Sequence, residues 1–208
     1  MNTESPLDVR NAAGVCSVEE DTRLLAQVSA EAGPAGGRAL DLGAGTGYVA
    51  IYLARRGFQV DATDISERAL ALTRQNAARC GAAINVFRSN LFEHAPGPYD
   101  LIAFNPPMNP RETEWTRLAT AFLRRHRTLA NLFMRAFDRF LRGSRVDFLA
   151  DFLIQAGERL TARGCIVMEL TRLEIEELAG RLPDFEFGRR VDIPRLPTEQ
   201  IVVIRRRR

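Results

Sequence analysis

The stretch ALDLGAGTGYVAIYLARRG, residues 39–57, decides the fold class. A short apolar run at 39–42 leads into a glycine-rich turn, and helical character follows over residues 48–56. The turn holds three glycines: Gly43, Gly45 and Gly47. Glycine permits positive φ angles and close approach of a ligand, while the free amides of a helix start accept an anionic group. We therefore predict a strand, a turn and a helix, with a candidate ligand site at the turn.

Strand and helix signals alternate outward from this unit. Further strands are predicted at residues 58–62, 84–88, 99–104, 165–170 and 199–204. Helices are predicted at residues 19–32, 66–80, 146–161 and after Thr171, and Ser66 is expected to cap the second of these. Because parallel strands need crossover connections, which are usually helices, this alternation predicts a parallel sheet covered on both faces.

Composition restricts the class of protein. A chain of 208 residues with 46% hydrophobic content has the size of one domain, which we take as residues 1–208. No apolar run approaches the roughly 18 residues that span a bilayer, and the start lacks the pattern of a secretion signal, so we expect a cytoplasmic protein without membrane contact. The three cysteines and two histidines lack ligand spacing, which argues against a disulfide framework or a metal site. All 29 basic residues are arginine, so no lysine can act as a nucleophile.

Two acids near the turn indicate the kind of ligand. Asp41 precedes the turn, and Asp64 ends the next predicted strand, where a carboxylate can accept hydrogen bonds from both ribose hydroxyls of a nucleoside. A dinucleotide fingerprint would place its third glycine at position 48, which is Tyr48 here. This spacing disfavours a nicotinamide-dependent oxidoreductase. An acid that ends a strand often only caps the next helix, but both acids together with the glycines favour a nucleoside site.

The segments DLGAGTG (41–47) and DATDIS (61–66) resemble the glycine and acidic motifs of class I S-adenosylmethionine methyltransferases. The resemblance covers nearly the whole chain. It implies an α/β, Rossmann-like, doubly wound and mostly parallel seven-stranded sheet with helices on both faces, and S-adenosylmethionine as cofactor. By similarity, the three glycines would face the methionine part of the cofactor, Asp64 would hold the ribose and Ile65 would pack on the adenine, and Asp41 would be a further cofactor-binding residue. Asn90 stands where the family commonly has an Asp that contacts the adenine amino group, and Leu91 follows it at the same end.

The fourth predicted strand runs directly into FNPPMNP, residues 104–110. Two consecutive prolines fix φ twice and cannot extend the strand, so they form a rigid turn with exposed carbonyls. Proline pairs usually mark only a strand stop, but this turn lies at the sheet edge where such folds bind ligands. It resembles the (Asp or Asn)-Pro-Pro-aromatic signature of enzymes that methylate nitrogen: HemK-type release-factor glutamine methyltransferases, adenine methyltransferases and some ribosomal RNA guanine methyltransferases.

The resemblance implies methyl transfer to a planar amide or amino nitrogen. Its delocalised lone pair is a weak nucleophile, and no ordinary side-chain base deprotonates it near neutral pH. The Asn105 oxygen and the Pro106 carbonyl, in a turn rigidified by Pro107, would accept its N–H groups, orient the lone pair and stabilise developing positive charge. Asn105 would also contact the cofactor. Met108 replaces the aromatic residue and offers a softer surface, so a protein glutamine, a nucleobase and a small metabolite all stay open as acceptors.

A second similarity lies near the amino terminus, within a segment 1–36 that we expect to be helical. VCSVEEDTRLL, residues 15–25, is similar to the Pro-x-Glu-Asp-Thr-x-Leu-Leu segment of the HemK group. Thr22 would then touch the cofactor. The acids beside it could equally compensate the helix dipole. A non-catalytic adaptor with the same fold is the remaining alternative.

Residues 108–146 are predicted to be a helical insertion after the fourth strand that covers the acceptor site as a lid. Within 111–145, nine arginines against three acids give a net charge of +6, so the rest of the chain, which totals +3, carries −3. At about 100° per residue the arginines lie opposite an aromatic stripe. They are either a solvated face or, through Arg117 and Arg124, contacts to an anionic or macromolecular acceptor. The stripe is either core or a homodimer contact.

Overall fold

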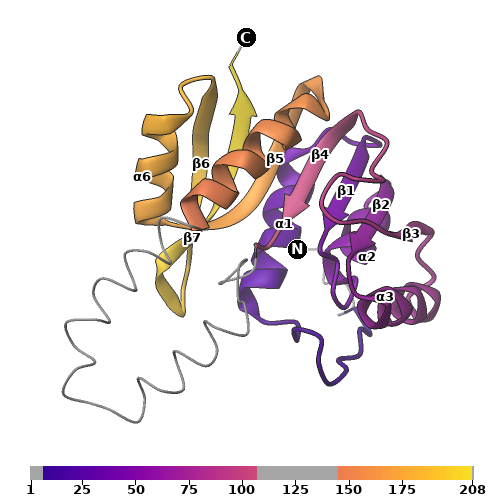
Figure 1. The fold of residues 1–208 in the computed structure, drawn as a ribbon. Coiled ribbons are helices and arrows are strands. Elements are labelled where there is room, and N and C mark those ends of the chain that lie inside the picture. Colours follow the sequence, from indigo (N-terminus) through magenta and orange to yellow (C-terminus); the bar gives the residue numbers. More distant parts are fainter. Residues whose placement is uncertain (1–6, 107–144, 208) are drawn as a thin grey trace, which may run out of the picture.

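The computed structural model describes residues 7–106 and 145–207 (Figure 1). Its centre is a seven-stranded sheet in the order β3-β2-β1-β4-β5-β7-β6. The strands are β1 (Arg38–Leu42), β2 (Gln59–Asp64), β3 (Ile84–Arg88), β4 (Tyr99–Phe104), β5 (Leu160–Thr171), β6 (Phe185–Ile193) and β7 (Leu196–Arg206). The first five strands pair in parallel, whereas β7 pairs antiparallel with both β5 and β6. The mostly parallel, seven-stranded sheet predicted from the sequence is therefore confirmed.

Helices cover both faces of the sheet. They are α1 (Glu20–Ala32), α2 (Tyr48–Ala54), α3 (Glu67–Arg79), α6 (Arg172–Arg181) and a helix over residues 145–158. Figure 1 shows α6 and the 145–158 helix on the side of the sheet opposite α1. The predicted cap of α3 is confirmed, because the Ser66 hydroxyl accepts a hydrogen bond from the Ala69 amide at 3.4 Å. No helix in the described part of the chain is long and apolar enough to cross a membrane.

Side-chain alternation along the strands divides the core in two. On one face, alternate residues of β1, β4, β5 and β7 pack against α1 and α2, with Leu25, Leu53 and Val167 fully or almost fully buried. On the other face, the intervening residues pack against the 145–158 helix and α6, with Phe152 and Ile166 fully buried. Two apolar layers on a sheet buried on both sides explain the nearly continuous apolar runs in the central strands.

Several bounds differ from those predicted, and local sequence did not predict one strand. Strand β2 occupies residues 59–64 rather than 58–62, β7 occupies 196–206 rather than 199–204, and the helix predicted at 146–161 occupies 145–158. The amino-terminal helix occupies only residues 20–32 of the predicted helical segment 1–36, and residues 7–19 form no helix. Strand β5 begins at Leu160, five residues before the predicted start, because Leu160 already pairs with Tyr99 of β4. The local pattern gave no strand at β6, since most of its residues are exposed or half-buried and form no apolar run.

The predicted helical insertion lies outside the described residues except at its end. The same holds for Pro107, Met108, Arg117 and Arg124, and for the homodimer contact expected through the insertion. These assignments stay predictions. The two flanking positions, Pro106 and Arg145, are described, and both line the cavity described below.

Candidate functional site

The turn after β1 is held by its neighbours in the sheet. Gly43, Gly45 and Gly47 all adopt left-handed backbone conformations, with φ of +72°, +55° and +79°. The amides of Gly43 and Ala44 both donate to the Thr63 carbonyl of β2, at 2.8 and 2.9 Å. These positions require glycine because other L-residues are strained there.

Gly47 has a second requirement, which is packing. A Cβ atom on Gly47 would lie 2.8 Å from Cγ2 of Thr73 on α3. The Thr73 hydroxyl also donates to the Gly45 carbonyl at 3.0 Å. Gly47 thus lets α3 approach the turn, and the described residues that line the cavity do not include it.

Asp64 is positioned by two backbone amides. One carboxylate oxygen accepts from the Gly45 amide at 3.1 Å, and the other accepts from the Ser66 amide at 2.9 Å. The carboxylate is therefore fixed between the glycine turn and the start of α3. Each oxygen keeps a lone pair for a ligand hydroxyl. Ile65, the next residue, is 63% exposed.

Asp41 is the most buried acid of the turn. Its carboxylate accepts from the Ala50 amide of α2 at 2.9 Å. Burial raises the pKa of Asp41 to about 7; the Ala50 hydrogen bond opposes this shift, and the charge of Asp64 adds to it. Asp41 thus links β1 to α2, and it is one of the residues that line the cavity described below.

The amino-terminal segment closes over the turn through Asn76, which is fully buried on α3. The Asn76 side-chain nitrogen donates to the carbonyls of Arg10 and Thr46, each at 2.9 Å, and its oxygen accepts from the Arg10 amide at 3.0 Å. One side chain therefore ties the segment to the glycine turn. Residues Gly14, Val15, Cys16 and Ser17 consequently line the cavity.

Asn105 is oriented by the first turn of α1. Its side-chain nitrogen donates to the Asp21 carboxylate at 3.0 Å, across 84 residues of sequence. The Thr22 hydroxyl donates to the other Asp21 oxygen at 3.3 Å. Only the nitrogen of an amide can donate to a carboxylate, so this bond leaves the Asn105 oxygen free to accept.

These elements surround one cavity of about 720 Å³ at the carboxyl ends of the parallel strands. That volume lies within the roughly 300–1,000 Å³ usual for small-molecule sites. From the glycine turn the cavity wall extends across the ends of β4 and β5 to the start of β7. At this far end it is lined by Asn105, Pro106, Arg145, Glu169, Thr171 and Glu199.

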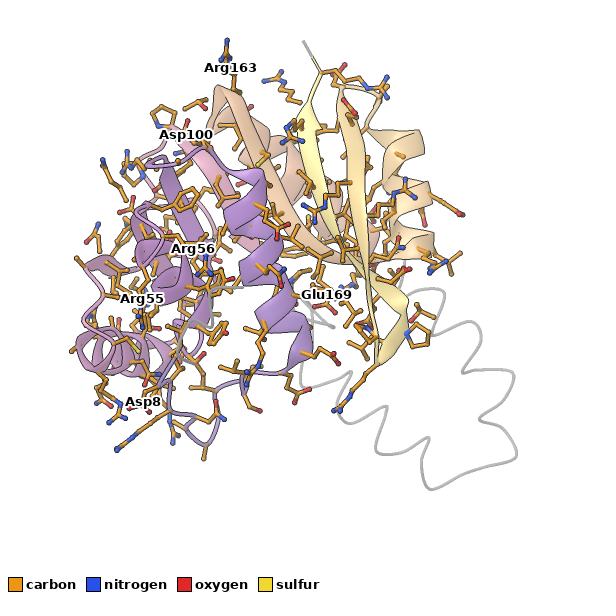
Figure 2. The ribbon with its side chains drawn as sticks, turned by 180° about the vertical axis from the view of Figure 1, so that it is seen from behind. Asp8, Arg55, Arg56, Asp100, Arg163 and Glu169 are labelled. Atoms are coloured by element: carbon orange, nitrogen blue, oxygen red, sulfur yellow. The ribbon has the colours of Figure 1, made fainter. Side chains whose placement is uncertain are left out.

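The far end of the cavity is acidic. Figure 2 shows Glu169 at the end of β5 that lies close to α1, away from Arg163 near the strand's beginning. Glu169 is 8% exposed, and no N–H group of the described residues donates a hydrogen bond to its buried Oε2 atom. Burial, a hydrogen bond with the Glu199 carboxyl and the charge of Asp21 raise the pKa of Glu169 well above its usual range, although Arg145 opposes them. Arg145 is ion-paired with the buried Glu174 at 2.6 Å.

Sequence comparison places this site in a known family. The model of the methyltransferase small domain matches residues 6–131, which is more than half of the chain. The chain belongs to the methyltransferase small domain family. This match agrees with the glycine turn, the acid that ends β2 and the Asn-Pro turn after β4, from which the family resemblance was drawn.

Two curated relatives of this chain carry the names of different methyltransferases. Over 94 residues the chain is 38% identical to ribosomal RNA small subunit methyltransferase C of Chromohalobacter salexigens, covering 44% of this chain and 28% of that protein. Over 98 residues it is 41% identical to release factor glutamine methyltransferase of Bordetella pertussis, covering 44% of this chain and 36% of that protein. The chain therefore matches about a third of the length of these relatives.

Solved structures share the fold at low sequence identity. The ribosomal protein L11 methylase of Lactobacillus delbrueckii superposes with a TM-score of 0.67 and 19% identity, covering 99% of this chain and 91% of that one. The tRNA (uracil-54, C5)-methyltransferase of Pyrococcus abyssi, solved with S-adenosyl-L-homocysteine, superposes with a TM-score of 0.54 and 20% identity, covering 89% and 38%. The helix-covered seven-stranded sheet of the methyltransferase small domain is thus the class I methyltransferase fold.

The structure gathers some of the predicted site residues at this cavity and leaves others apart. Those that line it are Thr22, Asp41, Gly43, Gly45, Asp64, Asn105 and Pro106. Those described but not lining it are Gly47, Ile65, Asn90 and Leu91. Leu91 has a positive φ of 48°, and its carbonyl accepts from the Ser89 hydroxyl at 2.8 Å. A role for any of these residues in ligand binding stays a prediction.

Sequence reasoning did not find the acidic residues at the far end. Glu169 lies in the last residues of the buried strand β5, near the carboxyl edge of the sheet that drew attention to Asp64. That signal could have identified it. The contact between Asp21 and Asn105 has no local signal, because the two residues meet only after the sheet and α1 have assembled.

Proposed function

We propose that this domain is an S-adenosylmethionine-dependent N-methyltransferase that acts on a planar amide or amino nitrogen. The observation that carries the proposal is the hydrogen bond from Asn105 to Asp21, which turns the Asn105 oxygen into an available acceptor at the end of β4. An amide used only as a structural contact has no need of an acid that fixes its orientation at an exposed position.

The described residues fit the methyl donor. Gly43 and Gly45 present backbone to the cavity without side chains, and a Cβ on either would have its nearest neighbour at 3.7 Å, so the turn leaves room beside it. Asp64 offers a fixed carboxylate to the ribose hydroxyls, and the exposed apolar Ile65 offers a surface to a flat base. When bound, S-adenosylmethionine supplies an electrophilic methyl group on a sulfonium.

Asn105 and Pro106 act on the acceptor nitrogen. The Asn105 oxygen accepts one N–H of the substrate, and the Pro106 carbonyl, which belongs to a residue without an N–H of its own, accepts another. Two fixed acceptors set the direction of the nitrogen lone pair and stabilise the positive charge that develops on the nitrogen. Asp21 is a positioning residue, because it acts through Asn105.

The class of methyl-accepting substrate is inferred from the two hydrogen-bond acceptors at the Asn-Pro turn and not from any single relative. The two relatives carry names of enzymes that act on ribosomal RNA and on a release factor, and both substrate types contain planar nitrogens. We infer a protein glutamine or a nucleobase as acceptor, with a small metabolite as the alternative. The three free cysteines support a cytoplasmic location.

The test is transfer of a labelled methyl group into a host lysate separated into protein, RNA and small molecules. The wild type should label one fraction. Asn105→Ala should abolish labelling while S-adenosylhomocysteine still binds, and Asp21→Asn should lower kcat by roughly tenfold without changing that affinity. Wild-type rates in both variants would show that the turn after β4 does not hold the acceptor. Absence of labelling by a wild type that binds the donor would favour the adaptor.

A further inference from the structure

We propose that the far end of the cavity is a subsite for a cationic N–H donor group of the acceptor substrate, a guanidinium or an ammonium, held by Glu169 and Glu199. The inference deepens the proposed function, because it names the chemistry that accompanies the methylated nitrogen. Nothing in the glycine turn or the Asn-Pro turn requires acids at this position.

The register of the sheet places the two acids together. Glu169 of β5 pairs with Ile201 of β7, and Glu199 pairs with Thr171. Because side chains alternate along a strand, Glu169, Thr171 and Glu199 share one face, with the two acids as diagonal neighbours. The same face carries α1, from which Asp21 contributes a third acidic group. A ligand at this position would therefore meet carboxyl groups from three elements.

Among the described residues, Glu169 lacks the backbone amide partners that hold Asp64 and Asp41 beside the glycine turn. Asp64 accepts hydrogen bonds from two backbone amides, and Asp41 accepts one from a third. By contrast, Glu169, which lines the cavity, is more than nine-tenths buried, and its Oε2 atom, itself buried, accepts no hydrogen bond from an N–H group of the described residues. A buried carboxyl oxygen without a donor is costly, and structures rarely keep one without a function.

The charge around the pair indicates the sign of the missing group. Among the cavity-lining residues that the structure describes, Arg145 is the one cation, and it is ion-paired with Glu174. Against it stand Glu169 and Glu199 with Asp21 nearby. A neutral N–H donor could hydrogen-bond to the Glu169 carboxyl, but only a cation also compensates the negative charge that Glu169 acquires when it gives up its proton.

The pair can adapt its charge to the ligand. Because burial and the hydrogen bond with Glu199 raise the pKa of Glu169, the Glu169 carboxyl holds a proton at neutral pH when no cation is present. An arriving guanidinium displaces that proton and bonds to both carboxylates. Binding of a cation should therefore tighten as the pH rises toward about 9, the pKa of Glu169 without a cation, with Asp21 adding to the attraction and Arg145 opposing it.

The experiment uses the full chain saturated with S-adenosylhomocysteine, which occupies the cavity beside the glycine turn. Added probes can then bind only at the far end of the cavity, beside Glu169 and Glu199. Methylguanidinium and methylammonium are titrated by NMR or calorimetry, with N-methylurea as a neutral probe of nearly the same shape as methylguanidinium. We expect a cation to bind at least roughly tenfold more tightly than N-methylurea. Glu169→Gln and Glu199→Gln should each weaken it by roughly tenfold or more. Glu186→Gln, at an exposed position on β6, is the matched control and should change nothing.

Each outcome decides a different point. Equal binding of the cations and N-methylurea, or unchanged cation affinity in both glutamine variants, would overturn the subsite. Retained S-adenosylhomocysteine binding in each variant shows that the variant is folded. If the wild type binds cations through Glu169 but does not bind S-adenosylhomocysteine, the subsite stands and the proposed methyl transfer falls. The stronger of the two cationic probes distinguishes an arginine-like from a lysine-like group.

Discussion

Replacing Asp41 by asparagine should make the stability of the protein less dependent on pH. Asp41 is fully buried against α2, and its pKa rises from 3.8 to about 7, chiefly through burial. The folded state therefore favours the protonated carboxyl. Its contribution to stability is fully present below the unfolded pKa and is lost as the pH rises through the folded pKa.

The size of the effect follows from the two pKa values. The shift of about 3 units corresponds to roughly 4 kcal/mol between the extremes of pH, at about 1.36 kcal/mol per unit. Between pH 5 and pH 8, which covers most of this window, the loss is about 2 to 3 kcal/mol. An asparagine at this position would carry no charge, and its side-chain oxygen would still accept the Ala50 amide.

The assay is urea unfolding of wild type and Asp41→Asn at pH 5 and pH 8. The variant should gain about 2 to 3 kcal/mol relative to the wild type on going from pH 5 to pH 8. Asp151→Asn, at an exposed position of the 145–158 helix, controls for the loss of one negative charge. A difference between wild type and Asp41→Asn that is the same at both pH values would refute the assignment of a buried, mostly protonated carboxyl.

Three further predictions concern the ligand and the turn. Asp64→Ala should weaken S-adenosylhomocysteine binding by about 1 to 3 kcal/mol in calorimetry, and unchanged affinity would count against its ribose role. Gly47→Ala should cost about 2 to 5 kcal/mol in urea unfolding, because its φ is +79° and the new Cβ meets Thr73, whereas Gly180→Ala on α6 has open space and should cost nothing. If the arginine-rich insertion binds an anionic acceptor, three glutamine replacements should raise the Michaelis constant and flatten its salt dependence; kinetics that match the wild type at every ionic strength would exclude this. Those replacements are at Arg117, Arg124 and Arg135.

Local sequence was sufficient to predict the bounds of a strand or helix where its buried residues form an apolar run or where a capping residue marks its start. β3 and β4 have the predicted bounds, because β3 lies between turns and β4 is buried on both faces. α3 begins where Ser66 predicts, since its hydroxyl can satisfy a free amide of the first turn. β6 could not be found in this way, because it is held by pairing with β7 rather than by an apolar run.

The part of the site beside the glycine turn was also predictable from the sequence, because its residues lie at or just after the ends of strands at one edge of the sheet. Asp64 and Asn105 both stand at such positions, and both line the cavity. The residues that orient them come from distant segments. Asp21 meets Asn105 across 84 positions, and Asn76 meets Arg10 across 66, so no short motif contains either contact.

The two ends of the cavity use carboxyl groups in opposite ways, and this contrast restricts the substrate. At the donor end, backbone amides hold Asp64 as a ready acceptor for neutral hydroxyls, so its geometry does not depend on the ligand. At the far end, Glu169 accepts no backbone amide of the described residues, and in the proposed subsite the ligand supplies the N–H groups. An anionic acceptor could approach the arginines of residues 111–145, yet the group that enters this end of the cavity has to bring N–H donors. A substrate that meets both demands carries positive charge beside its methylated nitrogen, whatever charge it carries elsewhere.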